Sequence, residues 1–168
     1  AKNIAIILYV RQRSGSDQVA RIAILDDGKG MDDKTLQDCL VFGSSTKSER
    51  KSIGRFGVGL GQASLFASSR VEVYSWQNGR DAKMVYLDTE KMRKGEQHEI
   101  PTPYNSKFPD EFSTFGSIST FFKESKINFK ENGTMIVWNN VDQISNRVST
   151  FEANLVEDLG RRFRYYIE

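Results

Sequence analysis

Two glycine-rich segments hold the residue types best suited to binding chemistry. In the first, Asp26-Asp27-Gly28-Lys29-Gly30, a carboxylate follows an apolar stretch and two glycines follow the carboxylate. These glycines allow a flat ligand close to the backbone, and Asp26 can accept hydrogen bonds from it. The second segment, residues 54–61, is dense in glycine and opens a predicted helix at 59–66. Because N–H groups at a helix start bind phosphate, the two segments together indicate a nucleotide pocket.

Each segment also has a simpler interpretation. Residues 26–30 fit an Asp-Gly turn that joins two elements, and residues 54–61 fit a flexible loop. The common phosphate-binding patterns do not decide the matter. No segment matches the Walker pattern, and Gly57-Val58-Gly59-Leu60-Gly61-Gln62 lacks the last glycine of the dinucleotide fingerprint and of the kinase glycine loop. The calcium-loop pattern is absent as well.

Composition narrows the class of protein. The 168 residues are the length of one domain, and a formal net charge of +2 gives no argument for nucleic-acid or membrane binding. The one cysteine, Cys39, and the one histidine, His98, exclude a disulfide framework within the chain and a multi-histidine metal site. No apolar run approaches the ~20 residues of a membrane span.

The elements that must position the two segments follow from patterning. Alternating apolar residues predict a hairpin over 3–26, and helical spacing predicts a helix over 31–41, with Asp32 and Asp33 as candidate caps. A long polar stretch, about 42–58, is typical of an exposed loop, and its place between the two glycine-rich segments lets it fold over a ligand as a lid. Asn78-Gly79 indicates a turn between strands 70–76 and 82–88. We further expect an insertion at about 89–132 with a helix near 111–123, a strand at 134–138 and a C-terminal helix at about 149–167.

These elements predict an α+β fold: a two-layer sandwich of a mixed, mostly antiparallel sheet with helices on one face. The whole chain, 1–168, then forms a single domain.

Three motifs in register resemble the GHKL ATPases, the superfamily of gyrase, heat-shock chaperones, histidine kinases and MutL, with their MORC relatives. Asp26-Asp27-Gly28-Lys29-Gly30-Met31 resembles the D-x-G-x-G box, Ile53-Gly54-Arg55-Phe56-Gly57-Val58-Gly59-Leu60 the second glycine box, and Gly133-Thr134-Met135-Ile136-Val137 the late G-T strand. Phe42-Gly43-Ser44-Ser45-Thr46-Lys47 is similar to MORC and related bacterial proteins. The resemblance covers about residues 1–138 and implies the Bergerat fold.

The resemblance also implies a role for each matching residue in binding ATP or ADP. Asp26 accepts a hydrogen bond from the adenine amine, Thr134 holds Asp26 and a bridging water, and Met31 contacts the purine. The residues implied in nucleotide binding are Asp26, Gly28, Gly30, Met31, Lys47, Gly54, Arg55, Phe56, Gly57, Val58, Gly59, Leu60 and Thr134. Backbone N–H groups of 57–60 contact the phosphates, Gly54 and Gly57 act as lid hinges, and Lys47 or Arg55 reaches the terminal phosphate.

One departure from the family concerns catalysis. The N box, a helix before the first strand, supplies the glutamate that activates water and the asparagine that holds Mg²⁺. No Glu-x-x-x-Asn segment precedes Ile4 here. We therefore expect no catalytic residue in this chain, which looks like a piece of a longer protein cut after that helix. In the parent, ATP would be hydrolysed with Mg²⁺ and would drive lid closure, domain closure or homodimerisation.

Two other functions stay open at this stage: a histidine-kinase catalytic domain, and a non-catalytic interaction module that uses nucleotide as a switch. The strand Gly133-Thr134 and the long segment before it fit kinases poorly. Partners other than adenine nucleotide, whether client protein or nucleic acid, stay unassigned. We expect no membrane association and a cytoplasmic location in a bacterium, or a nuclear one in a eukaryote.

Overall fold

One antiparallel sheet organises the molecule in the computed structural model, which describes residues 1–13, 15–41, 43, 59–107, 109, 131–141 and 148–163. Its strand order is β1-β2-β6-β3-β4-β5, and every pair of neighbours among the described residues is antiparallel. The strands are β1 (Ile4–Arg13), β2 (Ser16–Asp26), β3 (Arg70–Trp76), β4 (Lys83–Asp88), β5 (Tyr104–Asn105) and β6 (Gly133–Asn139). The described helices are α1 (Asp33–Asp38), α2 (Gly59–Ala67), α3 (Thr89–Arg93) and α6 (Val148–Phe163).

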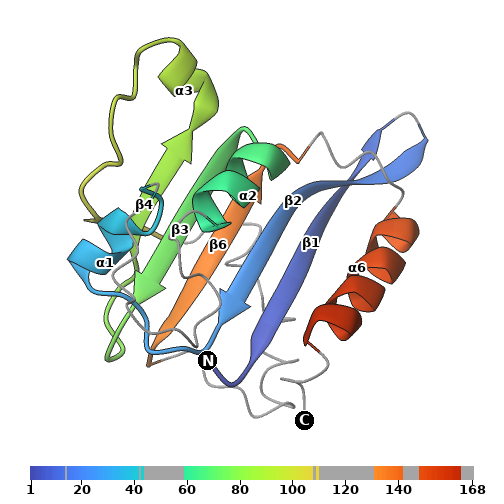
Figure 1. Cartoon of the computed structure of the whole chain (residues 1–168), viewed down its shortest axis with the longest axis horizontal. Helices are drawn as coiled ribbons and strands as arrows, with labels where there is room; N and C mark the ends of the chain where they lie inside the picture. Colours follow the sequence, from blue (N-terminus) through green and yellow to red (C-terminus); the bar gives the residue numbers. More distant parts are fainter. Residues whose placement is uncertain are drawn as a thin grey trace.

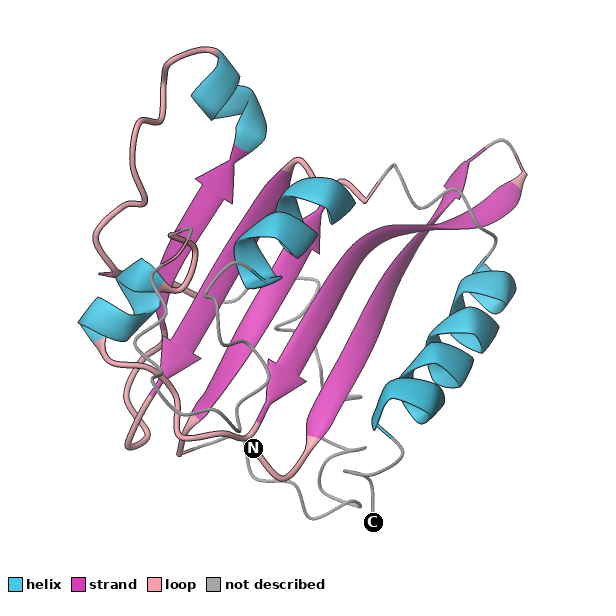
Figure 2. Ribbon diagram, in the orientation of Figure 1, coloured by secondary structure: helices cyan, strands magenta, loops and turns pink. Residues whose placement is uncertain are grey.

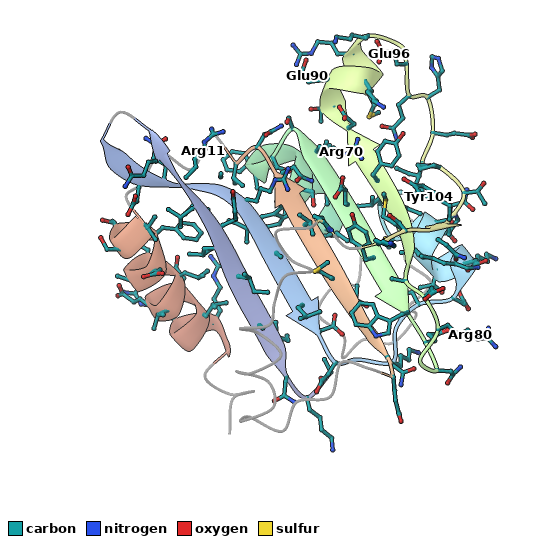
Figure 3. All side chains as sticks on the ribbon, turned by 180° about the vertical axis from the view of Figure 1, so that it is seen from behind. Arg11, Arg70, Arg80, Glu90, Glu96 and Tyr104 are labelled. Carbon is teal, nitrogen blue, oxygen red and sulfur yellow. The ribbon has the colours of Figure 1, made fainter. Side chains whose placement is uncertain are left out.

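Alternation along the strands gives the sheet two apolar faces. One face, called here the helix face, carries Val71, Val73, Val85 and Leu87 in one cluster with Leu36 and Leu40, next to the α1 helix. The opposite face, called the rear face, carries Ala23, Leu25, Tyr74, Trp76, Met84, Met135 and Val137. Figure 3 shows this rear face, and no helix of the described residues lies over it.

Three helices pack on the helix face. Leu36 of α1 is fully buried there, and Leu60 of α2 packs against the same cluster. At the β1–β2 end of the sheet, Val148 and Phe151 of α6 pack against Val19 and Ile22. Figures 1 and 2 show α1 and α2 in front of the sheet and α6 beside β1. The predicted α+β sandwich with helices on one face is therefore confirmed.

Most predicted elements are present, with shifted ends. The helix predicted over 31–41 is the shorter α1, because Asp32 has an extended backbone and caps the helix by accepting a hydrogen bond from the Thr35 N–H. The predicted C-terminal helix is α6, and residues 164–168 lie outside the described part. Within the predicted insertion, α3 and β5 are short elements that the sequence did not reveal. The helix predicted near 111–123 lies outside the described residues.

Candidate functional site

The candidate site is built on one cross-strand row at the end of the sheet. The pairing registers place Asp26 opposite Thr134, Thr134 opposite Ser75 and Ser75 opposite Lys83. Because their alternation matches that of Ile24, Ile136 and Val73, these four residues lie on the helix face. Four strands thus bring together residues that lie up to 108 positions apart in the sequence (134 − 26). Asp26 and Thr134, which were singled out from separate motifs, are direct neighbours.

Asp26 is a half-buried carboxylate with few partners. Its Oδ1 atom accepts a hydrogen bond of 2.7 Å from the Gly28 N–H, and within the described residues no other donor reaches this side chain. Burial raises the pKa of Asp26 above its ordinary value of 3.8, and the Gly28 bond opposes that rise only in part. The Oδ2 atom therefore remains available as a hydrogen-bond acceptor for a ligand.

Residues 27–31, called here the glycine loop, are held in place by hydrogen bonds to residues at the end of β3. Ser75 Oγ accepts a 2.7 Å hydrogen bond from the Met31 N–H and donates a 3.0 Å bond to the Gly133 carbonyl. The side chain of Gln77 donates from Nε2 to the Lys29 carbonyl at 2.9 Å. Neither Ser75 nor Gln77 belongs to one of the three motifs, and only their hydrogen bonds in the folded structure reveal their role.

The structure explains Gly28 and Gly30 differently from the sequence, which suggested that they let a flat ligand approach the backbone. Gly30 has φ +68°, and a Cβ there would lie 2.2 Å from the Trp76 carbonyl oxygen. At Gly28 a Cβ would lie 2.6 Å from Asp26 Oδ1. The absent side chains thus make room for the protein's own strand and carboxylate, and a close approach by a ligand is not needed to explain them.

Asp27, the neighbouring carboxylate, has a separate task. It accepts hydrogen bonds from the N–H groups of Lys2 and Asn3 at 2.7 and 2.9 Å, and from the Asn3 side chain at 2.6 Å. Burial works against these bonds, yet together they hold the pKa of Asp27 below its ordinary value. Asp27 therefore fastens the start of β1 to the end of β2, and Asp26 is the carboxylate left for binding.

Sequence comparison decides the family. Residues 1–120, more than half of the chain, match the family described as histidine kinase-, DNA gyrase B- and HSP90-like ATPase. The chain belongs to this ATPase family. No curated protein gives a significant match to it. Membership of the family, which is the GHKL type, makes the chain an ATP-binding domain with adenine nucleotide as its ligand.

The residues that the resemblance assigns to the phosphates and the lid are described only in part. Gly59 and Leu60 are the first two residues of α2, and the Leu60 side chain packs into the core cluster on the helix face. Met31 packs at the edge of the same cluster. Six other residues implied in nucleotide binding lie outside the described part: Lys47, Gly54, Arg55, Phe56, Gly57 and Val58.

An open hollow of about 860 Å³ lies beside the row, between the start of α1 and the β3–β4 turn. Its lining includes Ser75 and Lys83 from the row and Met31 from the glycine loop, but neither Asp26 nor Thr134. The Lys83 ammonium forms a 2.6 Å ion pair with Asp33 at the start of α1. This exposed pair links the start of α1 to β4 at the rim of the hollow.

Other chemistry finds little support in the described residues. They contain no group of three or more His, Cys, Asp or Glu side chains placed to hold a metal ion. Burial raises the pKa of the Cys39 thiol to about 12, so this cysteine stays protonated and is a poor nucleophile at neutral pH. No helix in this part of the chain is long and apolar enough to cross a membrane.

Proposed function

We propose that ATP binds over the row formed by Asp26, Thr134 and Ser75, with its adenine at Asp26 and its phosphates at the start of α2. The observation that carries this proposal is the half-buried Asp26 carboxylate, which has one hydrogen bond from the described residues and lies beside the buried Thr134. Asp26 Oδ2 would accept a hydrogen bond from the exocyclic amine of adenine. Thr134 would hold Asp26 and a bridging water beside the base.

Base selection follows from the same carboxylate. Guanine presents a carbonyl oxygen where adenine presents its amine, and two acceptors facing each other repel. A hydrogen bond to a charged group contributes about 1.5–3 kcal/mol. ATP and ADP should therefore bind more tightly than GTP. Met31, at the edge of the core cluster, would contact the face of the purine.

The phosphates would bind to backbone N–H groups at residues 57–60, where the helix start concentrates unpaired donors. Lys47 or Arg55 would reach the terminal phosphate. In this proposal Gly54 and Gly57 are the hinges of a lid over about residues 42–58, with Phe56 within it. Binding of ATP would order and close this lid.

Hydrolysis of ATP to ADP and phosphate is proposed for the longer parent protein, because the nucleotide-binding residues proposed above include no catalytic group. A glutamate to activate water and an asparagine to hold Mg²⁺ would come from an N box outside these residues. The described residues offer no carboxylate cluster for Mg²⁺, so we assign the ion no step here. In the parent, ATP would drive dimerisation, in the manner of the chaperone, MutL and MORC branches. A cytoplasmic or nuclear location goes with this proposal.

Calorimetric titration with ATP, ADP and GTP, each with and without Mg²⁺, tests the proposal. We expect binding that selects adenine and depends little on Mg²⁺. Equal binding of ATP and GTP would remove the role of Asp26, and absence of any adenine-nucleotide binding would overturn the proposal as a whole. A phosphotransfer assay with candidate histidine-containing partners separates the kinase alternative, which predicts a phosphorylated partner.

A further inference from the structure

Within the described part of the chain, one side-chain hydrogen bond joins α2 to β6, the strand that carries Thr134. The Trp138 indole Nε1–H donates to Ser64 Oγ at 2.9 Å, across 74 positions of sequence. Ser64 lies in the middle of α2, and only 1% of its surface is exposed. A buried hydroxyl paired with a specific indole is costly to leave unpaired, so this bond constrains where α2 can sit.

Trp138 is well placed to transmit that constraint. It lies on the helix face four residues after Thr134 in β6, about 13 Å along the strand. Its ring packs both on the cluster that includes Leu60 and on the cluster that includes Phe151 of α6. Packing against two clusters therefore orients the indole, independently of its hydrogen bond to Ser64.

The other contacts of α2 with the sheet constrain its first turn less than this hydrogen bond does. At the C-terminal end, Ser68 Oγ donates to the Arg70 carbonyl at 3.0 Å and ties the helix to the start of β3. At the N-terminal end, Leu60 packs on the core cluster, an apolar contact that is less directional than a hydrogen bond. Ser64 is five residues after Gly59, about 7–8 Å along the helix axis. The Trp138–Ser64 bond is thus the directional contact closest to the start of α2 among the described residues.

We propose that Ser64 and Trp138 are positioning residues that set the start of α2 at a fixed distance from Asp26 and Thr134, and so tune affinity for the phosphates of the nucleotide. This inference rests on the proposed function, because it assigns the phosphates to the start of α2. Neither residue touches the nucleotide. The bond links the two halves of the proposed site: β6 carries Thr134 at one end and the indole further along, and α2 carries the hydroxyl that the indole meets.

The test compares ligands that differ only in phosphate. Dissociation constants for adenosine and ADP are measured with the full-length protein as wild type, Ser64→Ala, Trp138→Phe and the double variant. Loss of one hydrogen bond predicts that ADP affinity falls about three- to tenfold, while adenosine affinity stays within twofold of wild type. Because both single changes break one bond, the double variant should lose little more than either one.

Ser69→Ala is the matched control. It also removes a serine hydroxyl that accepts a side-chain hydrogen bond, from Asn140 Nδ2 at 3.3 Å, but Ser69 lies outside α2. It should change neither affinity. The indole N–H signal in a nitrogen-edited NMR spectrum reports whether Ser64→Ala, the smaller change, has broken the bond in a folded protein.

The outcomes separate the two proposals. Suppose that the wild type binds ADP. If Ser64→Ala and Trp138→Phe then leave both affinities unchanged, or weaken adenosine and ADP binding equally, the positioning role is overturned and the proposed function stands. Wild type that binds neither ligand overturns both. A selective loss of ADP affinity in Ser64→Ala and Trp138→Phe, absent from Ser69→Ala, supports the positioning role.

Discussion

The two ends of strand β3 are both rich in polar side chains, but they use them differently. At the first end, on the rear face, Arg70 donates to Glu72 at 2.8 Å and to Asp88 at 3.3 Å, and its guanidinium lies 4.3 Å from the centre of the Tyr86 ring. Figure 3 shows Arg70 on this face. At the other end, on the helix face, Ser75 holds the glycine loop beside Asp26. Around Arg70 the carboxylates are paired with a guanidinium, whereas Asp26 at the other end accepts one hydrogen bond from the described residues.

The two aspartates show the difference in their protonation. For Asp88, burial would raise the pKa, but a 3.0 Å hydrogen bond from the Lys91 N–H and the contacts with Arg70 hold it below its ordinary value. For Asp26, burial outweighs both the Gly28 hydrogen bond and the charge of the N-terminal amine, and it raises the pKa. A carboxylate whose ionised form is well solvated by the protein stabilises the fold, whereas a poorly solvated one is a candidate to accept a hydrogen bond from a ligand.

The largest effect should come from Gly30→Ala. The substitution forces a side chain into a left-handed backbone conformation and against the Trp76 carbonyl, so we expect a loss of about 2–5 kcal/mol in the free energy of unfolding. Urea unfolding measures it. Gly79→Ala is the matched control: Gly79 has φ +67° but nothing within 4 Å of a Cβ, so strain alone should cost about 1 kcal/mol. Equal losses would show that the glycine loop is not pressed against β3.

Asp26→Asn should weaken ATP binding by roughly ten- to a hundredfold, which is the size of one lost charge-assisted hydrogen bond. Titration calorimetry measures the change. The sign for stability is the opposite: because the folded-state pKa of Asp26 is raised, ionisation disfavours the fold, and that penalty appears as the pH rises through this pKa. The variant should therefore melt no lower than wild type at pH 7. A lower melting temperature at that pH would contradict the contrast between the two ends of β3.

Asp88→Ala should have the smallest effect and the reverse pattern. It removes the cap of α3 and one partner of Arg70, for a loss of about 1–2 kcal/mol in stability, with no change in ATP affinity. Because the pKa of Asp88 is lowered, its stabilisation is present above the ordinary value of 3.8 and is lost as the pH falls through the folded-state pKa. Thermal melts between pH 7 and pH 3 measure this, and the difference between wild type and variant should shrink on acidification. A difference that stays constant with pH would assign the effect to packing.

Local patterns predicted what depends on local physics. The hairpin of β1 and β2, the Asn78-Gly79 turn and the cap at Asp32 follow from apolar alternation and from backbone preferences over a few residues. The short elements α3 and β5 were missed, since a helix of five residues and a strand of two leave no periodicity to detect. In the candidate site, Asp26 and Thr134 were found because each belongs to a motif.

The sequence by itself determined the family of this protein, the order of its longer elements and the carboxylate at the end of β2, because motifs and alternation are written in consecutive residues. Only the tertiary structure decided that Ser75 and Gln77 hold the glycine loop, that Asp27 fastens the start of β1, and that Trp138 bonds Ser64. These contacts join residues 24 to 74 positions apart. Their partners are set by strand register and helix packing, which no local spacing encodes.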